Sequence, residues 1–413
     1  MRALTSGAER VVIMNHHLLR WGIAATVLTG GLTGLGFTVG RSASAAPDNV
    51  GATVDAVVTQ PATGTLTQVS SDFAAPVGVS AFNGTVYMSN TSENQVTELN
   101  SQTGVSNPFA GLFTGVGESG DGGPASAATL NQPMGTAEDA AGNVYIADTR
   151  DNVIREVDAS TGIIARFAGS GKAGDKKPSG KGVKAQFYAP QAVAVDAAGD
   201  VFVADTGNNR VDEVLPNGKI VGFAGTGKPG YAGDRGKATK AKLNQPTGLA
   251  IDGAGDVYIA DAGNDVIRRV DAKTGKISTV AGDFEADQAD DGVGGFSGDG
   301  GPATSARLYD PEGVALDSAG DLFIADRLNN AIREVTPDGN IFTVVNQAAT
   351  AGAAPAAGKE TNGPATNSKL NGPTAVAVDN SNGTLWIADT SNGRISKVTG
   401  LAQSGTGAGP VAP

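Results

Sequence analysis

One unit recurs six times along this chain, and no other feature constrains the fold so strongly. The clearest copies contain a short phrase ending in Pro, an alternating run, an Ala-Asp step and a further apolar run. The prolines that anchor the copies lie 57, 57, 56, 65 and 62 residues apart, and they are Pro76, Pro133, Pro190, Pro246, Pro311 and Pro373. Long repeats whose runs alternate as strands do predict a propeller or a solenoid.

The copy at 243–282 shows how one unit divides. Alternating apolar residues predict strands at 247–252, 257–261, 266–271 and 276–282. Turns rich in Gly, Asn and Asp separate these strands. Four strands in each of six units predict an all-β fold, a six-bladed β-propeller of four-stranded antiparallel blades over residues 64–401.

The two ends of the repeat region predict how the ring closes. Residues 64–69 match 275–280, which form a fourth strand, whereas the last unit stops after its third strand at 394–398. The N-terminal strand can therefore join the last blade as its missing outer strand. Such closure pairs backbone groups that an open end would leave exposed.

The first 45 residues have a different character. Residues 21–39 carry no charge, and Ala43, Ser44 and Ala45 offer small side chains for cleavage. This pattern predicts a signal peptide at 1–45 and a secreted, extracytoplasmic protein without stable membrane insertion. An uncleaved anchor and a start at Met14 stay open, because the apolar run approaches the roughly 20 residues that span a bilayer. Residues 46–63 and 402–413 are small and polar, which predicts a flexible linker and a flexible tail.

Composition excludes several kinds of site. The chain has no Cys, and its two histidines, His16 and His17, lie in the predicted leader. The remaining chain therefore has no thiolate, no His-ligated zinc and no Ser-His-Asp relay. Without the four arginines and Glu9 of the leader it has 26 basic and 41 acidic side chains, a net charge of −15. So acidic a surface argues against nucleic acid as a partner.

Two charged positions recur at fixed places in the units. An Asp ends the second strand in five units, at Asp148, Asp205, Asp261, Asp326 and Asp389. These carboxylates could form a cation site or an acid–base pair. Their repetition favours a structural role instead, as acceptors for backbone amides of the following turn. The third strand carries an Arg in five units, predicted to be an edge charge that pairs with the acidic surface, at Arg155, Arg268 and Arg333, and two places earlier at Arg210 and Arg394.

The loops between the units carry the remaining candidates. They are long, variable and Gly-rich, as is typical of sites that a rigid scaffold positions. The candidate ligand-binding residues in these loops are Asp121, Tyr231, Asp234, Phe296 and Asp299. The loop after the fourth unit is rich in acids, and its candidate calcium ligands are Asp287, Asp290 and Asp291. Their spacing differs from an EF-hand loop, and no other cofactor is predicted.

The units resemble NHL repeats over about residues 64–400. The resemblance lies in PQAVAVD (190–196), GDVFVAD (199–205) and TGNNRV (206–211). The loops GDGGPASAATL (120–130) and GDGGPATSARL (298–308) are similar to those of bacterial and teneurin-type NHL propellers. The resemblance implies the propeller fold and a family that ranges from protein- and RNA-binding modules to a lyase and extracellular sensors.

We therefore expect a secreted, monomeric, non-catalytic binding or scaffold module. Its interblade loops would meet a protein or glycan partner, since rigid blades fix the loops and loop variation supplies specificity. The alternative is a calcium-dependent hydrolase or lactonase of the six-bladed type, with carboxylates that line the central channel.

Overall fold

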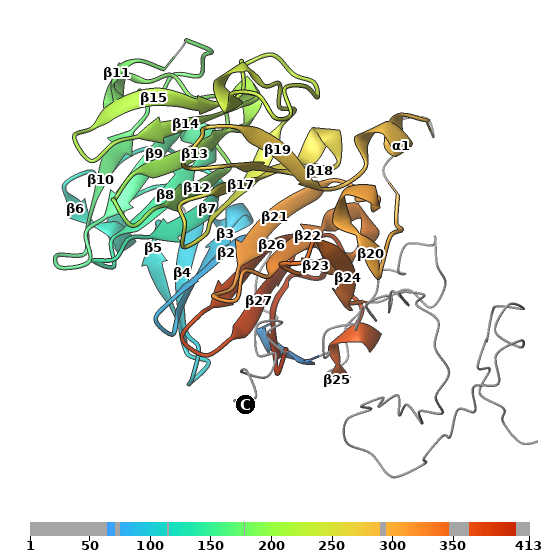
Figure 1. The fold of residues 1–413 in the computed structure, drawn as a ribbon. Helices are drawn as coiled ribbons and strands as arrows, with labels where there is room; N and C mark the ends of the chain where they lie inside the picture. The colour runs from blue at the N-terminus through green and yellow to red at the C-terminus, as the bar shows by residue number, and fades with distance from the viewer. Residues whose placement is uncertain are drawn as a thin grey trace, which may run out of the picture. The chain divides into compact units, whose positions relative to one another are not determined.

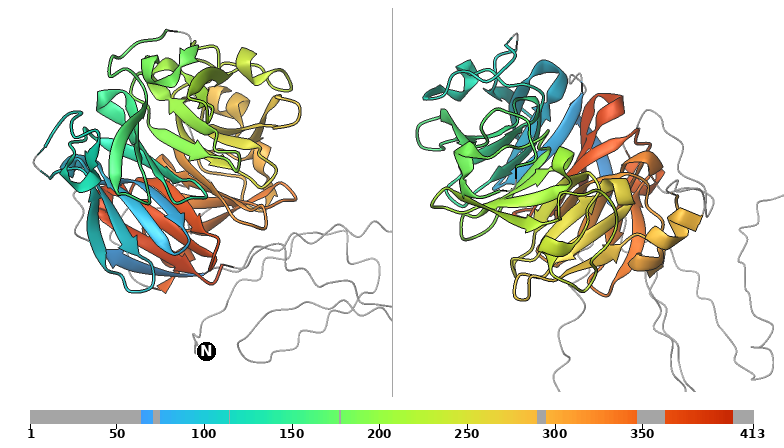
Figure 2. Two further views of the ribbon diagram at one scale, coloured as in Figure 1. Left: turned by 90° about the vertical axis from the view of Figure 1, so that its left-hand side faces the viewer. Right: turned by 90° about the horizontal axis from the view of Figure 1, so that it is seen from above.

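The computed structural model describes residues 64–70, 75–113, 115–176, 178–289, 295–346 and 363–401. The predicted signal peptide (1–45), linker (46–63) and tail (402–413) lie outside the described residues. Six antiparallel sheets stand around a central axis (Figures 1 and 2). The prediction of an all-β, six-bladed propeller is therefore confirmed. No helix within the described ranges is both long enough and apolar enough to cross a bilayer.

Each blade begins at the axis and adds strands outward. The first strands are β2 (Pro76–Phe82), β7 (Pro133–Glu138), β12 (Ala192–Val195), β16 (Pro246–Ile251), β21 (Pro311–Leu316) and β26 (Pro373–Asp379). The second strands are β3 (Thr85–Asn90), β8 (Val144–Asp148), β13 (Val201–Asp205), β17 (Val257–Asp261), β22 (Leu322–Asp326) and β27 (Thr384–Asp389). The third strands are β4 (Gln95–Asn100), β9 (Val153–Val157), β14 (Arg210–Val214), β18 (Val266–Val270), β23 (Ala331–Val335) and β28 (Arg394–Thr399). The fourth strands are β5 (Ser106–Ala110), β10 (Ile163–Ala168), β15 (Lys219–Ala224), β19 (Ile277–Ala281), β24 (Asn340–Val345) and β1 (Thr65–Ser70).

Every blade has the four predicted antiparallel strands, and four blades add a fifth, outermost strand. These outermost, two-residue strands are β6 (Gly123–Pro124), β11 (Gly180–Lys181), β20 (Gly301–Pro302) and β25 (Gly363–Pro364). Each comes from the loop before its blade and pairs with the fourth strand. In three of them a Pro limits further pairing, because Pro has no backbone N–H to donate. The fifth strand thus covers an edge that would otherwise be open.

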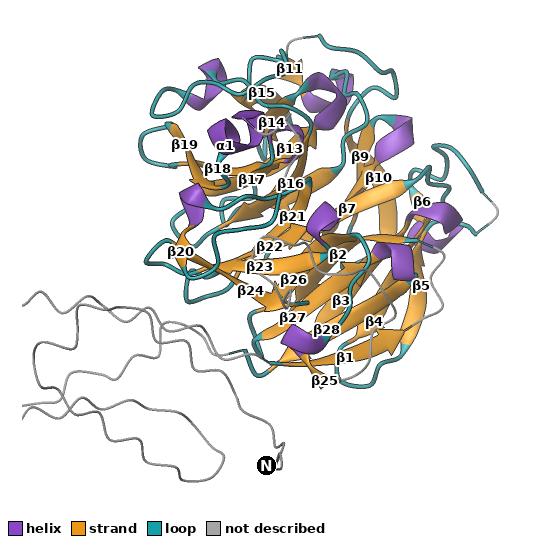
Figure 3. Cartoon of the chain, turned by 90° about the vertical axis from the view of Figure 1, so that its right-hand side faces the viewer, coloured by secondary structure: helices purple, strands orange, loops and turns teal. Residues whose placement is uncertain are grey.

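Short helical turns connect the strands (Figure 3). A 3₁₀ turn follows each second strand, at η2 (Thr91–Glu93), η4 (Thr149–Asp151), η6 (Thr206–Asn208), η8 (Ala262–Asn264), η10 (Arg327–Asn329) and η12 (Thr390–Asn392). Another precedes five blades, at η3 (Ala125–Ala127), η5 (Gly182–Lys184), η7 (Ala238–Lys240), η9 (Ala303–Ser305) and η11 (Ala365–Asn367). The helix α1 (Phe284–Ala289) lies in the loop after the fourth blade.

The N-terminal strand closes the ring as predicted. β1 pairs antiparallel with β28, with Leu66 opposite Val398, and β25 then covers β1. The Leu66 side chain is fully buried among residues of blades five and six. The last blade is therefore built from both ends of the repeat region (Figure 1).

The apolar core is divided among the six interfaces between neighbouring blades. Each interface contains one cluster of buried side chains. The closing interface of blades six and one, for example, buries Trp386 beside Met88. The alternating apolar residues of the strands supply these clusters, since successive side chains point to opposite faces of a sheet.

A hydrogen-bonded latch joins neighbouring blades on the face where the first strands begin and where the 3₁₀ turns follow the second strands. We call this face the interblade face. The residue that ends the 3₁₀ turn has a positive φ, and its side-chain oxygen accepts the N–H of the residue before the next anchoring Pro. In this way Asn152 Oδ1 accepts the Ala189 N–H at 2.9 Å. The other latch pairs are Asn94–Gln132, Asn209–Gln245, Asp265–Asp310 and Asn330–Gly372. At the closing interface the equivalent residue is Gly393, which has no side chain.

Replacing Asn152 by Ala should test the latch. The variant loses the acceptor for the Ala189 N–H and places alanine, which tolerates the left-handed region less well than asparagine, at φ 57°. Asn83→Ala is the matched control, since Asn83 has φ 49° in an exposed hairpin turn without a latch. We expect Asn152→Ala to lower the free energy of unfolding by about 1–2 kcal/mol more than the control does. Equal losses in urea denaturation would show that the latch adds nothing.

Candidate functional site

The residue directly after each anchoring Pro lies on the inner side of its blade, and its type varies among the blades. These six residues surround the opening of the channel on the interblade face, and we name them the mouth ring: Val77, Met134, Gln191, Thr247, Glu312 and Thr374. The position after the ring is Gly or Ala in every blade. The next blade lies close at this position: a Cβ at Gly78 would be 2.0 Å from the Met134 carbonyl oxygen, and the other three glycines are similarly confined, whereas blades three and six have room for the single methyl of Ala192 and Ala375. Packing therefore fixes one position and leaves the ring beside it free to vary.

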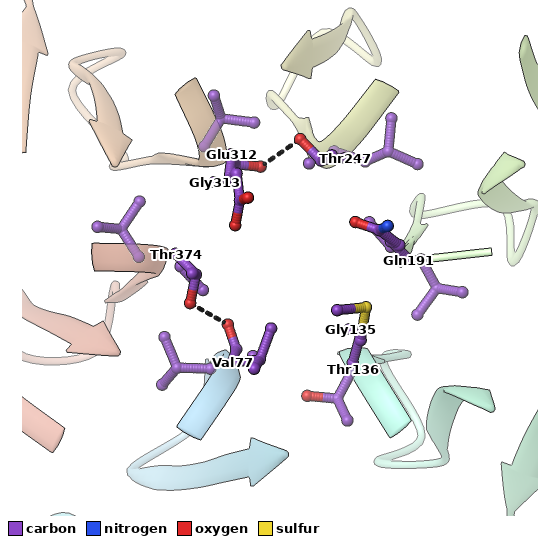
Figure 4. Close-up of a pocket in the computed structure, with 18 residues that line it drawn as sticks. Val77, Gly135, Thr136, Gln191, Thr247, Glu312, Gly313 and Thr374 are labelled. Carbon is purple, nitrogen blue, oxygen red and sulfur yellow. Dashed lines mark hydrogen bonds between the residues drawn. The ribbon is translucent and has the colours of Figure 1, made fainter. Parts of the chain in front are cut away.

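The mouth ring lines a cavity of about 80 Å³ on the axis. Two of its hydroxyls are occupied, since Thr247 Oγ1 donates to the Glu312 carbonyl at 3.0 Å and Thr374 Oγ1 to the Val77 carbonyl at 2.7 Å. Figure 4 shows the side chains of Gln191 and Glu312 directed toward the opening. An amide and a carboxyl are thus the polar groups that the ring offers to a ligand.

Glu312 is the group in the ring with perturbed acidity. Burial raises the pKa of its carboxyl to about 7, and the positive charge of Arg327 opposes that rise. Arg327 Nε lies 3.4 Å from Glu312 Oε1, and its Nη1 also pairs with Asp310. The carboxyl can therefore accept or donate a proton near neutral pH, while the arginine holds it in place.

The repeated aspartates tie the second strand to the loop before the blade. Their Oδ1 atoms accept backbone N–H groups 17 or 18 residues upstream, at Asn131, Tyr188, Asn244, Tyr309 and Asn371. Four of the five also accept a side-chain amide from the following turn, as Asp261 does from Asn264 at 2.8 Å. The prediction that these carboxylates accept backbone N–H groups of the following turn was wrong, because the backbone donors come from the interblade loop instead. Burial raises the pKa of Asp205, Asp261 and Asp326 to about 6.

The repeated arginines are not edge charges, so that prediction was wrong. Strand three lies inside each sheet, and Arg155, Arg268 and Arg333 are fully buried. Each guanidinium faces the repeated Asp of its blade, as Arg333 Nη1 does with Asp326 Oδ2 at 3.2 Å. Arg210 and Arg394 start two places earlier but reach the same Asp, both at 2.7 Å. An Arg therefore neutralises the repeated Asp in five blades.

The five candidate ligand-binding residues contact these buried arginines. Asp121 pairs with Arg155 at 2.6 Å, and the same partnership joins Asp234 to Arg268 and Asp299 to Arg333. The rings of Tyr231 and Phe296 lie 4.8 Å and 4.7 Å from the guanidinium carbons of Arg268 and Arg333. Tyr231 also stacks on Phe284 at 4.2 Å. These contacts occupy the groups within their own blades, and a ligand role for them stays a prediction.

The three candidate calcium ligands are not placed by the structure. Asp290 and Asp291 lie outside the described residues, and only the backbone of Asp287, in α1, is described. Among the residues that are described, no group of three His, Asp or Glu side chains is arranged to hold a metal ion. Calcium binding by the acidic loop stays a prediction.

Sequence reasoning missed a polar group between the inner strands of blades one and two. Ser80 Oγ donates to Glu138 Oε1 at 2.6 Å and lies 2.7 Å from Thr136 Oγ1. Burial raises the pKa of Glu138 to about 7. The sequence did contain a signal for this group: Thr136 and Glu138 are polar where the next blade has the apolar residues Val193 and Val195.

Glu334 in blade five should make stability depend on pH. Its side chain is 1% exposed, neither carboxyl oxygen has a hydrogen-bond partner among the described residues, and burial raises its pKa from 4.5 to about 8. Between about pH 4.5 and pH 8 the Glu334 carboxyl is protonated in the folded protein and ionised in the unfolded chain. The stability that the neutral carboxyl contributes is therefore full below pH 4.5 and is lost as pH rises through 8.

Glu334→Gln should therefore raise the free energy of unfolding on the order of 3 kcal/mol at pH 8.5 and change it little at pH 4.5. The control is Glu156→Gln at the equivalent place in blade two. Burial raises the pKa of Glu156 too, but Tyr145 donates a hydrogen bond to its carboxylate at 3.3 Å and opposes that rise, so the gain at pH 8.5 should be smaller. Urea denaturation at the two pH values measures both. A gain for Glu334→Gln that is the same at both pH values would disprove the titration.

The structure is a closed six-bladed propeller. Its blades share one architecture, and they differ in the side chains of the mouth ring. A family model described as the teneurin NHL domain matches residues 65–181, 227–290 and 289–390, and the NHL repeat model matches 187–211. These matches cover more than half of the chain. The chain belongs to the NHL-repeat family, in its teneurin type.

Three curated relatives illustrate the similarity. NHL repeat-containing protein 2 of Bos taurus is 28% identical over 295 residues, which cover 65% of this chain and 39% of that protein. Teneurin-4 of Mus musculus is 31% identical over 282 residues, 60% of this chain and 10% of that protein. Protein SUPPRESSOR OF QUENCHING 1, chloroplastic, of Arabidopsis thaliana is 28% identical over 276 residues, 65% and 25% of the two chains. The chain thus spans well under half the length of each of these relatives.

Two solved structures have the same fold. An auxiliary nutrient binding protein from Bacteroides thetaiotaomicron gives a TM-score of 0.55 at 15% identity, over 79% of this chain and 69% of that chain. A gluconolactonase from Xanthomonas campestris gives 0.53 at 14% identity, over 82% and 89%. At such identities the likeness shows the fold alone, which serves both binding and catalysis.

Proposed function

We propose that this protein is an exported, non-catalytic binding module whose interblade face meets a protein or glycan partner. The observation that carries the proposal is the mouth ring, where variable side chains from six blades meet on a scaffold that latches hold in place. Binding sites are commonly placed on variable positions that a rigid scaffold fixes. The leader pattern supports export, and the proposal includes a monomer without nucleic acid as a partner.

A capture experiment from the extracytoplasmic fraction tests the binding role. The exported protein serves as bait in three forms: the parent, Gln191→Arg in the mouth ring, and Lys273→Glu in the exposed β18–β19 turn, which is not part of the mouth ring. Support is a partner that the parent and the Lys273 variant retain and the Gln191 variant loses. Equal capture by all three, or no specific capture, contradicts the proposal. Mass spectrometry of the exported chain tests whether it begins at Ala46.

A second candidate, a calcium-dependent lactonase, is favoured by one observation. Glu312 places a carboxyl with a pKa of about 7 at the mouth of the channel, where it could act as an acid or a base. Its pairing with Arg327 argues against a metal at the same oxygens. Lactone hydrolysis that needs calcium, together with a calcium-specific rise in melting temperature that EDTA reverses, would move the assignment to this candidate.

A further inference from the structure

A second cavity opens beside the mouth ring on the interblade face. It has a volume of about 440 Å³, within the range of small-molecule sites. Blades three, four and five line it, and we name its main residues the mouth pocket: Tyr188, Gln191, Gln245, Thr247, Asp310 and Glu312. The mouth pocket shares three residues with the axial cavity, so a ligand in it would meet the variable ring.

Tyr188 supplies an exposed aromatic surface held in one place. Its N–H donates to Asp205 Oδ1 at 2.7 Å, and its carbonyl accepts the Gly207 N–H at 2.8 Å. A Cβ at Gly207 would lie 2.6 Å from Tyr188 Cδ1, so the ring rests against the glycine backbone. The residue is nevertheless 53% exposed. A fixed ring with an open surface suits a ligand that has both C–H groups and hydroxyls.

The polar groups of the mouth pocket are mainly amides without partners. No hydrogen bond joins the side chains of Gln191 and Gln245 to other described residues. Each amide offers two donors and an acceptor, which matches hydroxyls that both donate and accept. Gln245 is positioned by the latch, because its N–H donates to Asn209 Oδ1 at 3.0 Å.

The charges of the mouth pocket select against an anion. Its charged lining residues are the acids Asp310 and Glu312, and Arg327, which pairs with both, is not part of the lining. A carboxylate or phosphate would face these acids without a free cation to balance it, at a cost in desolvation and repulsion. A neutral ligand keeps the hydrogen bonds without that cost.

We propose that the mouth pocket binds one or two residues of a neutral sugar chain, which lie against Tyr188 and hydrogen-bond to Gln191, Gln245 and Glu312. The inference rests on the proposed binding function and names the class of ligand at its interblade face. The aromatic surface takes the C–H face of the sugar, and the amides and the carboxyl take its hydroxyls.

Titration calorimetry and saturation-transfer NMR with the full chain test the proposal. The probes are glucose, galactose, mannose, N-acetylglucosamine and their disaccharides, with glucuronate as the acidic counterpart of glucose. We expect saturable binding of at least one neutral probe, with a Kd below about 10 mM, and binding of glucuronate weaker by about tenfold or more.

Tyr188→Ala and Gln191→Ala should each weaken binding about tenfold. Tyr188→Phe keeps the ring and should retain binding. Phe113→Ala, which changes another exposed aromatic residue (60% exposed) on a distant interblade loop, should leave it unchanged.

Three outcomes would overturn the proposal: no saturation by any neutral probe, unchanged affinity in a folded Tyr188→Ala variant, or preference for glucuronate over glucose. The melting temperature of each variant shows whether it is folded. If no sugar binds while capture still recovers a protein partner that Gln191→Arg loses, the sugar proposal fails and the binding module stands. If both experiments fail, the proposed function fails with it.

Discussion

Replacing Arg268 by Met should lower the free energy of unfolding by about 3–5 kcal/mol, whereas replacing its neighbour Arg269 by Met should cost less than about 1 kcal/mol. Both residues lie on β18, so the two variants share a strand and a change in side-chain shape. They differ in surroundings. The Arg268 side chain is fully buried between Asp261 and Asp234, whereas the Arg269 side chain is 37% exposed beside Asp256. Without Arg268, Asp261 is left buried and loses its countercharge.

Urea denaturation of the two variants at pH 7 measures the difference. A double variant, Arg268→Met with Asp261→Asn, should recover part of the loss, because the buried carboxylate is then absent. The Asp261→Asn change keeps a side-chain oxygen that can accept the Asn244 N–H, as the Asp261 carboxylate does at 2.6 Å. Similar losses in the Arg268 and Arg269 variants would show that the buried pair has no structural role.

The blades and their closure could be predicted from the sequence because the signals are local and repeated. The strands predicted in the fourth unit end within one residue of β16, β17, β18 and β19. Alternation and turn residues determine such boundaries within a few positions. The two-residue strand β20 was missed, since a Gly-Pro pair inside a loop has no alternation to detect.

The partners of the charged residues could not be predicted in the same way, because they depend on long-range geometry. The sequence predicts Asp121, Asp234 and Asp299 as loop residues that meet a ligand, and it does not show that each also pairs with a buried arginine of its own blade. One signal for this pairing was present. The aspartate precedes its arginine by 34 residues in all three units, although the spacing between whole units varies.

The mouth ring was also readable in principle. Its residues follow the anchoring prolines directly, and the variation from Gln191 to Thr247 to Glu312 stands beside a position that is always Gly or Ala. The sequence cannot show that six blades bring these residues around one opening. The off-axis pocket needs the fold as well, since Tyr188 and Asp310 come from loops of different blades.

A chain that begins at residue 75, and so lacks β1, should lose cooperative folding. β1 supplies the fully buried Leu66 and the backbone partners of β28, whose edge would otherwise be open. The expected loss is comparable to the whole stability of a domain, about 5–15 kcal/mol. A chain that begins at residue 64 keeps β1 and is the matched control. Thermal unfolding followed by circular dichroism compares the two, and a cooperative transition at similar temperature in both would disprove the role of β1 in closure.

A permuted chain tests whether stability depends on having β1 as the outer strand of blade six or on β1 coming from the N-terminal end of the repeat region. In blade four a six-residue turn joins Val270 to its partner Ile277, and in blade six the corresponding partners are Val398 and Leu66. The permuted chain would contain residues 75–400, then two linker residues, then residues 64–70. It would reproduce that turn length, and the fourth strand of blade six would follow the third directly along the chain. This permuted chain should regain cooperative unfolding near the temperature of the control, because the outer strand is restored. Since its blade six no longer joins the two ends of the chain, its unfolding rate should rise if that junction supplies kinetic stability.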